Sequence, residues 1–172
     1  MSVPRVDVII IRGAPGVGKS EVAKCLARHF PGGAKVEVDI LRKMIISVQW
    51  TDQREHTELL QVAARVVGDF LGLGFRPVIV IDTFSGDKVD SFLKTLQQLN
   101  SSPTVRLFGL HAAETALRQR LDRRPVGQFK DFEISAKLNR DLLHIRRPEE
   151  TQIEASDLCA KELAQIIVSK LA

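Results

Sequence analysis

A glycine-rich run near the start of the chain carries the strongest chemical signal in the sequence. Residues 13–20 read G-A-P-G-V-G-K-S, which places a lysine and a serine directly after the last glycine. Glycines let backbone N–H groups point inward at a phosphate, and a following helix adds partial positive charge at its N-terminus. Lys19 would reach the β- and γ-phosphates of a nucleotide, and the Ser20 hydroxyl would hold Mg²⁺. The spacing therefore predicts a nucleotide site formed by Gly13, Ala14, Pro15, Gly16, Val17, Gly18, Lys19, Ser20 and Glu21.

Aspartates stand at the ends of two further apolar runs. Asp39 closes the run 36–39, Arg42 follows three positions later, and Asp82 follows the run 78–81. If these runs are parallel strands, both carboxylates project into the crevice where such sheets bind ligands. Asp39 could orient the proton of an attacking hydroxyl, and Arg42 could clamp a substrate anion. Asp82 could bind Mg²⁺ or orient substrate. Helix capping by Asp39 and turn capping by Asp82 are the alternatives.

Basic residues are concentrated in the second half of the chain. The segment 118–147 has nine Lys and Arg against four Asp and Glu, a net charge of +5, while the whole chain carries +4. Arg120 and Arg124 are four positions apart, so a helix would place them on one face. A local basic excess favours an anionic ligand, with a solvated helix face as the alternative.

The spacing of apolar residues predicts the strands and helices that position these side chains. Apolar patterns predict strands at 6–11, 36–39, 78–81, 105–110 and near Ile153, of which 36–39 and the last are short. Helical spacing predicts helices from Ser20 to Phe30, at 40–48, from a polar break at 50–53 to Gly72, and at 89–99, 113–123, 132–144 and 157–171. Strands that alternate with helices predict an α/β domain whose parallel sheet is covered on both faces.

Composition excludes several other classes of protein. The 172 residues suit one domain, and no apolar run approaches the roughly 20 residues that span a membrane. The short apolar stretch near the N-terminus runs straight into the glycine loop, so we expect no signal peptide. Cys25 and Cys159 cannot form a disulfide framework, which fits a reducing cytoplasm. No paired spacing suggests a metal site among the histidines, which we interpret as surface or structural: His29, His56, His111 and His144.

The order of strand, glycine loop, helix, strand and D-x-x-R resembles the P-loop kinases of small molecules and polynucleotides, which are AAA-type ATP-binding kinases. This group includes polynucleotide 5′-hydroxyl kinases, chloramphenicol phosphotransferases, zeta-toxin-like kinases, shikimate kinases and adenylylsulfate kinases. The resemblance covers nearly the whole chain and implies one three-layer P-loop NTPase domain over residues 1–172, with strand order 2-3-1-4-5. The aspartate that matches Asp39 in that group acts as base or orients the acceptor hydroxyl, and the arginine that matches Arg42 contacts substrate. Residues 118–131 resemble the basic lid, in which arginines matched here by Arg120 and Arg124 cover the phosphates.

Together these features predict transfer of the γ-phosphate of Mg-ATP to a hydroxyl group. The expected catalytic residues are Lys19, Asp39, Arg120 and Arg124, with substrate contacts from Asp39, Arg42 and Asp82, and Mg²⁺ contacts from Ser20 and Asp82. Only 5% of residues are aromatic, and no extended basic surface with interleaved aromatics is evident. We therefore expect a small-molecule acceptor rather than a polynucleotide, and no obligatory protein partner. A P-loop ATPase or a nucleotide-binding regulatory module without an acceptor is the alternative, although no N-K-x-D sequence for guanine occurs.

Two further side chains are candidates for stacking. Arg147, next to Arg146, precedes the last strand, where folds of this group hold adenine. Trp50 could stack on a ring of the substrate or fill a gap in the core.

Overall fold

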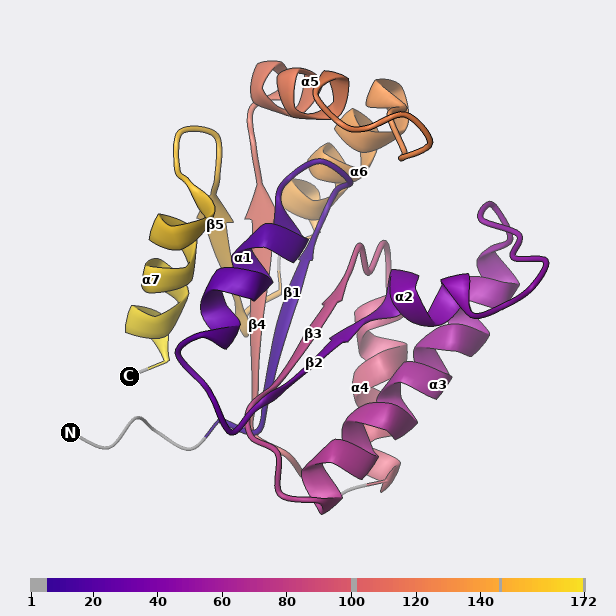
Figure 1. Cartoon of the computed structure of the whole chain (residues 1–172), viewed down its shortest axis with the longest axis vertical. Helices are drawn as coiled ribbons and strands as arrows, with labels where there is room; N and C mark the ends of the chain where they lie inside the picture. Colours follow the sequence, from indigo (N-terminus) through magenta and orange to yellow (C-terminus); the bar gives the residue numbers. More distant parts are fainter. Residues whose placement is uncertain (1–5, 100–101, 146, 172) are drawn as a thin grey trace.

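Continuous apolar runs form the centre of a parallel sheet. The computed structural model describes residues 6–99, 102–145 and 147–171. Every residue of β1 (Val8–Gly13) and β3 (Val78–Asp82) is buried, as expected for strands covered on both faces. β4 (Val105–His111) lies beside β1, and the more exposed β2 (Ala34–Glu37) and β5 (Glu150–Glu154) form the edges. The order β2-β3-β1-β4-β5 confirms the predicted topology (Figure 1).

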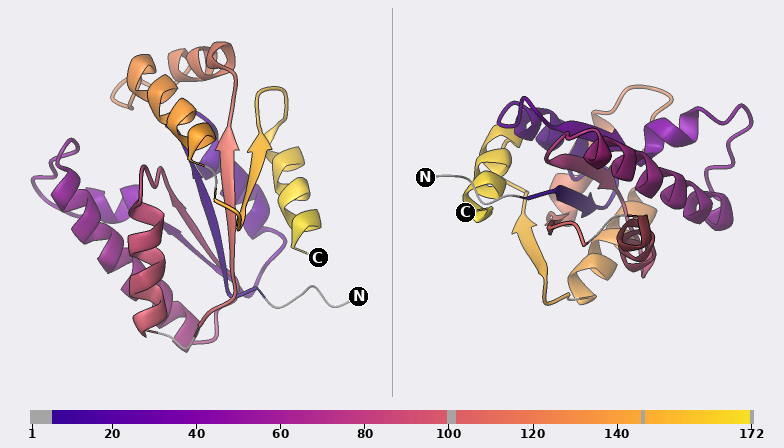
Figure 2. Two further views of the ribbon diagram at one scale, coloured as in Figure 1. Left: turned by 180° about the vertical axis from the view of Figure 1, so that it is seen from behind. Right: turned by 90° about the horizontal axis from the view of Figure 1, so that it is seen from below.

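Helices cover both faces of this sheet and divide the core into two layers. Successive side chains of a strand point to opposite faces, so Ile9 and Ile11 pack toward α1 (Lys19–Ala27) and α7 (Ala160–Lys170). Val8 and Ile10 pack toward α3 (Gln53–Gly72) and α4 (Lys88–Leu99). The views from behind and from below show these helices on the two sides of the sheet (Figure 2). In the part of the chain that the structure describes, no helix is both long enough and apolar enough to cross a bilayer.

The remaining helices lie near the carboxyl ends of the strands. α2 (Val38–Lys43) follows β2, while α5 (Glu114–Asp122) and α6 (Phe132–His144) follow β4. The Asn139 side chain of α6 donates to the backbone oxygen of Ala112 at 2.9 Å and accepts from its N–H at 3.0 Å, which fixes α6 to the end of β4. The strand arrows in Figure 1 point toward α5, so α5 and the loop after α2 lie near the ligand-binding edge of the sheet.

Several element boundaries differ from the sequence prediction. β2 ends at Glu37, where its pairing with β3 stops, so Asp39 does not close the strand but lies in the first turn of α2. A negative side chain is favourable there because of the helix dipole. α2 ends at Lys43 rather than at residue 48, and the β-branched run that follows is a poor helix former. α7 begins at Ala160 rather than at residue 157, because Cys159 and Glu162 form a capping box at that point.

Candidate active site at the carboxyl ends of the strands

The glycine loop runs between the end of β4 and α5. A Cβ atom on Gly13 would lie 2.4 Å from the Leu110 carbonyl oxygen. Gly16 has a φ of +89°, and a Cβ there would lie 2.9 Å from Leu121 Cδ2 of α5. Both positions therefore require glycine, one because of a neighbouring strand and the other because of its left-handed backbone and a neighbouring helix. The loop is thus fixed in place at the N-terminus of α1, as the phosphate-binding prediction requires.

The Lys19 ammonium is satisfied only by backbone oxygens of its own loop. Its Nζ donates to the carbonyl oxygens of Gly13 at 2.7 Å and Ala14 at 3.0 Å. Burial lowers the pKa of Lys19 to about 8, against the opposing negative charges of Asp82 and Asp39. Hydrogen bonds between charged partners are stronger than those to neutral carbonyls. Phosphate oxygens that entered the loop would therefore displace these carbonyls as partners of Lys19.

A carboxylate that the sequence analysis missed lies beside Ser20. The Ser20 hydroxyl donates to Glu37 Oε2 at 3.0 Å, and Glu37 also forms an ion pair with Lys35. Burial would raise the pKa of Glu37, but the hydrogen bond and charge of Lys35 and the Ser20 hydroxyl lower it, so the carboxylate is ionised. A hydroxyl next to an ionised carboxylate suits Mg²⁺, which keeps several waters and uses few carboxylates. Among the described residues no three His, Cys, Asp or Glu side chains could enclose a metal, so phosphate and water oxygens would complete its coordination.

Asp82, which the sequence predicts to contact Mg²⁺ or substrate, lies in a buried hydrogen-bond network. It is only 5% exposed. Its carboxylate accepts the Phe84 backbone N–H at 2.9 Å and contacts His56 Nε2 at 3.1 and 3.2 Å. On the other side of the ring, Lys88 Nζ lies 3.0 Å from His56 Nδ1. An ammonium has no acceptor lone pair. His56 Nδ1 therefore accepts from Lys88, and Nε2 carries the hydrogen that is donated to Asp82.

The environments of the two aspartates push their pKa values in opposite directions. Burial would raise the pKa of Asp82, but the hydrogen bonds from His56 and Phe84 lower it. The Asp39 side chain reaches solvent and accepts no hydrogen bond from any described residue. Partial removal of the Asp39 carboxyl from water and the negative charge of Asp82 raise the pKa of Asp39. The positive charges of Lys19 and Arg42 oppose this shift. Such a separation is typical of carboxylates with different tasks: Asp82 is ionised and held by its partners, whereas the carboxyl of Asp39 is accessible and its pKa is raised.

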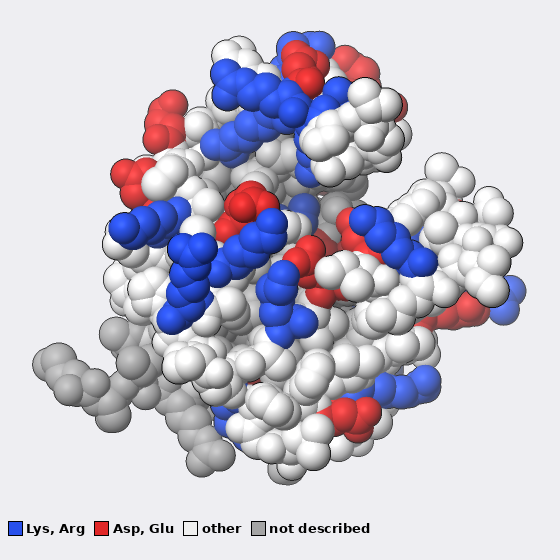
Figure 3. Space-filling view, viewed as in Figure 1, with Lys and Arg blue, Asp and Glu red and all other residues white. Residues whose placement is uncertain are grey.

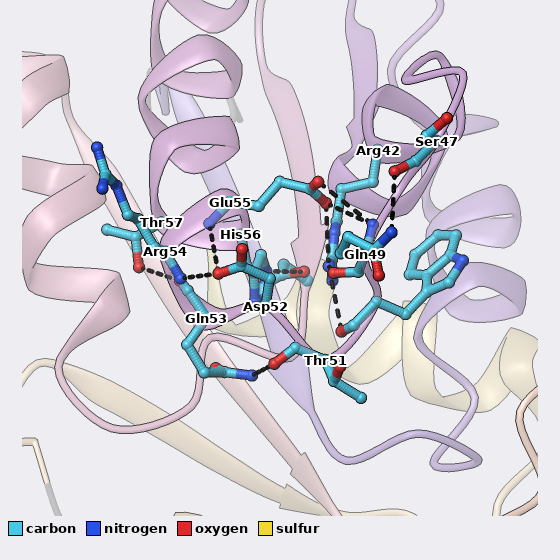
Figure 4. A network of polar contacts seen from close by, with 12 residues as sticks. Arg42, Ser47, Gln49, Thr51, Asp52, Gln53, Arg54, Glu55, His56 and Thr57 are labelled. Atoms are coloured by element: carbon cyan, nitrogen blue, oxygen red, sulfur yellow. Dashed lines mark hydrogen bonds and ion pairs between the residues drawn. The ribbon is translucent and has the colours of Figure 1, made fainter.

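Arg42 is buried and organises the loop after α2, as Figure 4 shows. Its Nη2 donates to the carbonyl oxygens of Gln49 and Trp50, both at 3.2 Å. The guanidinium carbon lies 4.7 Å from the Trp50 ring centroid, and Glu55 Oε1 is 3.7 Å from Nη2. Trp50 is 46% exposed, so it does not fill a gap in the core. The Nε atom of Arg42 is buried and has no hydrogen-bond partner among the described residues.

The two arginines predicted to share a face have different partners. Arg120 donates to the carbonyl oxygens of Val17 and Ser156, both at 3.0 Å, and to that of Ala155, so it links α5 to the glycine loop and to the loop after β5. Arg124 lies beyond the end of α5, where its Nη1 donates to the Phe129 carbonyl oxygen at 3.0 Å. Burial lowers the pKa of Arg124, and the negative charge of Asp39 acts against this shift. The charge of Arg124 therefore interacts with that of Asp39.

Charged side chains gather around the hollow between α5 and the loop after α2, with Lys and Arg prominent over α5 (Figure 3). Arg118 is exposed and stacks on Phe132, its guanidinium carbon 3.6 Å from the ring centroid, and Arg123 is exposed as well. A separate cavity of about 510 Å³ lies between α5 and the loop after β5, lined by residues that include Ala116, Gln119 and Ser156. A cavity of this size can hold a small organic ligand.

Arg147 lies away from this cavity. It forms an ion pair with Asp90 at the start of α4 and donates to the Gly86 carbonyl oxygen at 3.3 Å. Arg146 lies outside the described residues. The structure therefore gives no support to the expectation that this pair stacks on adenine.

Solved structures share the fold of this chain. The tunicamycin resistance protein of Deinococcus radiodurans is 22% identical and superposes with a TM-score of 0.73, over 98% of this chain and 96% of that chain. The APS kinase of Mycobacterium tuberculosis, solved with AMPPNP and APS, is 18% identical with a TM-score of 0.73, over 98% of both chains. The shikimate kinase of Acinetobacter baumannii, solved with shikimate, is 24% identical with a TM-score of 0.60, over 96% of this chain and 93% of that chain.

At these identities the likeness shows a shared P-loop kinase-type fold. No curated protein matches the chain in sequence. The AAA domain family matches residues 8–167, which include the glycine loop and every strand of the sheet. The chain therefore belongs to the AAA domain family.

Proposed function

We propose that this protein is an ATP-dependent kinase that transfers the γ-phosphate of Mg-ATP to a hydroxyl group of a small molecule or nucleotide. The observation that carries the proposal is the accessible carboxylate of Asp39, which has a raised pKa and lies close enough to Lys19 for their charges to interact. A phosphate-binding lysine beside a free base is the arrangement that phosphoryl transfer to an alcohol requires. The kinases among the solved structures of the same fold support this reading.

The nucleotide would lie across the glycine loop. Lys19 would pair with its terminal phosphates, and the cavity beside Gln119 and Ser156 would take the base. Ser20 and Glu37 would hold Mg²⁺, since their oxygens already lie 3.0 Å apart. When bound, the metal would neutralise phosphate charge and orient the γ-phosphate.

The reaction itself needs one proton transfer and one displacement. The acceptor oxygen attacks the γ-phosphorus while the bond to the oxygen that bridges the β- and γ-phosphates breaks, and ADP leaves. Asp39 takes the proton of the acceptor hydroxyl, and its raised pKa makes it a stronger base than an ordinary aspartate. Lys19 and Arg124, whose charges interact with each other and with Asp39, offset the negative charge on the transferring group.

Transfer of label from γ-labelled ATP tests this proposal. Wild type, Asp39→Asn and Lys19→Ala are compared on a pooled panel of small alcohols and 5′-hydroxyl oligonucleotides. The amide cannot take the proton, so we expect Asp39→Asn to lower transfer by roughly 10²- to 10⁴-fold while ATP affinity stays within about twofold. Lys19→Ala should lose ATP binding as well.

One result would refute the kinase assignment, and another would refute the assignment of Asp39 as the base. Release of free phosphate with no labelled acceptor would favour an ATPase or a nucleotide-binding module. Transfer by Asp39→Asn at the wild-type rate would show that Asp39 is not the base.

A further inference from the structure

Lys88 is a half-buried cation whose contacts are all neutral. It is the first residue of α4, and its Nζ donates to Gln53 Oε1 at 2.6 Å and to His56 Nδ1 at 3.0 Å. No carboxylate of a described residue lies within ion-pair distance of Nζ. Burial lowers the pKa of Lys88, because its charge is partly removed from water. A partly desolvated charge without a counter-ion is costly unless a ligand supplies one.

Lys88 lies near the end of β3 and near Arg42. His56 joins it to Asp82 at the end of β3, and its charge interacts with that of Arg42 near the loop after α2. The oxygens of Asp82 are directed to His56 and to the Phe84 N–H, so Asp82 does not contact Lys88. Asp87 affects Lys88 only through its charge. The charges of Lys88 and Lys19 therefore both interact with that of Asp82, and Lys88 is joined to Asp82 through His56.

The contacts of Lys19 resemble those of Lys88. Both lysines lie near Asp82 and donate only to neutral acceptors, and Lys19 holds this state in the loop that receives phosphates. Charge-assisted hydrogen bonds to an anion are stronger than those to amides and imidazoles.

We propose that Lys88 binds an anionic group, a carboxylate or a phosphate, of the phosphate acceptor. This inference rests on the proposed kinase function and narrows its substrate class. The acceptor is a hydroxyl compound with a negative charge on the same molecule, and Lys88 positions that charge while the hydroxyl lies at Asp39. Lys88 thereby determines specificity on the acceptor side, as Lys19 does on the nucleotide side.

Matched acceptors and matched variants test the role of Lys88. Hydroxy acids, sugar phosphates and the neutral polyols of the same carbon skeletons are compared as acceptors from γ-labelled ATP. The variants are Lys88→Met, Lys88→Arg, which keeps the charge, and Lys94→Met, which removes an exposed lysine farther along α4. The first two acceptor sets separate a carboxylate from a phosphate as the recognised group.

We expect wild type to prefer one anionic set over its neutral skeletons by at least about tenfold in kcat/KM. Lys88→Met should lower kcat/KM for that set by roughly 10- to 100-fold, mainly through KM, because a hydrogen bond to a charged group is lost. The same variant should leave neutral acceptors and ATP affinity within about twofold. Lys88→Arg should retain most of the preference, and Lys94→Met should match wild type.

If Lys88→Met lowers kcat/KM equally for anionic and neutral acceptors, the proposal is overturned, because Lys88 would then only support His56. A wild-type preference for neutral acceptors would overturn it too.

If wild type transfers phosphate to none of the acceptors, the kinase function fails, and binding of the same compounds becomes the test of the anion site. The same compounds are then titrated into the protein with AMPPNP while the fluorescence of Trp50, the single tryptophan, is followed. Weaker binding of an anionic compound to Lys88→Met would support the anion site, whereas equal binding, or none to wild type, would refute it.

Discussion

Raising the pH from 7 to 9 should weaken ATP binding about tenfold, and Lys19 is the cause. Burial among the atoms of the glycine loop lowers the pKa of Lys19 to about 8 in the free protein. Only the protonated lysine can pair with phosphate oxygens, and those oxygens raise its pKa once they are bound. The contribution of Lys19 to affinity is therefore complete well below pH 8 and is lost as the pH rises through 8.

The magnitude follows from the fraction of charged lysine. With a pKa of about 8, Lys19 is about nine-tenths protonated at pH 7 and about one-tenth protonated at pH 9. The ratio is about tenfold in the dissociation constant, or about 1.4 kcal/mol of binding free energy. Binding must also take up protons, about half a proton per ATP at pH 8 and nearly one at pH 9.

Titration calorimetry with a non-hydrolysable ATP analogue measures both quantities. Titrations at pH 7, 8 and 9 in two buffers of different ionisation enthalpy give the affinity and the proton uptake. Lys19→Gln, which has no charge to lose, should bind weakly at every pH and take up no proton in this range. An affinity of wild type that is equal at pH 7 and pH 9, or a Lys19→Gln variant with the wild-type pH dependence, would refute the assignment to Lys19.

Two further predictions concern the metal and the fold. Glu37→Gln should raise the Mg²⁺ concentration needed for half-maximal phosphate transfer by roughly 10- to 100-fold, because the carboxylate beside the Ser20 hydroxyl is lost; an unchanged Mg²⁺ dependence would exclude Glu37 from the metal site. Gly109→Ala should lower the free energy of unfolding in urea by about 3–5 kcal/mol, because its Cβ would lie 2.3 Å from Glu150 Oε1 and break the buried ion pair of Glu150 with Arg12. Gly72→Ala, where a Cβ meets no atom within 4 Å, should be neutral or stabilise α3 by up to about 1 kcal/mol, and equal destabilisation by both alanines would contradict the packing argument.

The central sheet could be predicted because its strands have a pattern that few other structures produce. Residues 8–11 and 78–81 are uninterrupted aliphatic runs, which only strands covered on both faces and short buried helices tolerate. The glycine loop then distinguished the two, since it must join a strand to a helix. The strand order came from resemblance to P-loop kinases, because alternation of strands and helices alone does not determine which strands are neighbours.

The parts of the site that were missed depend on contacts between distant positions. His56 has no other histidine at a metal-binding spacing, and its partners Asp82 and Lys88 lie 26 and 32 positions away. Arg12 is a charged residue in an apolar strand. It pairs with Glu150 at 2.6 Å, and Glu150 lies 138 positions later in the sequence. Glu37 was overlooked because the predicted strand ran two residues too far and made Asp39 its end. A carboxylate pair E-x-D at the end of a short strand was the available signal.

The two arginines predicted to belong to a lid show why helical spacing alone can mislead. Positions four apart share a face only while the helix continues, and α5 ends at Asp122, between Arg120 and Arg124. Arg120 therefore stays on the helix and holds it to the Val17 and Ser156 carbonyl oxygens. Arg124 instead belongs to the loop 123–131, which is tied at this side chain by a single exposed hydrogen bond to Phe129. If the loop 123–131 closes over bound phosphates, Arg124 would move toward Asp39 without breaking the contacts of Arg120, and α5 would stay in place.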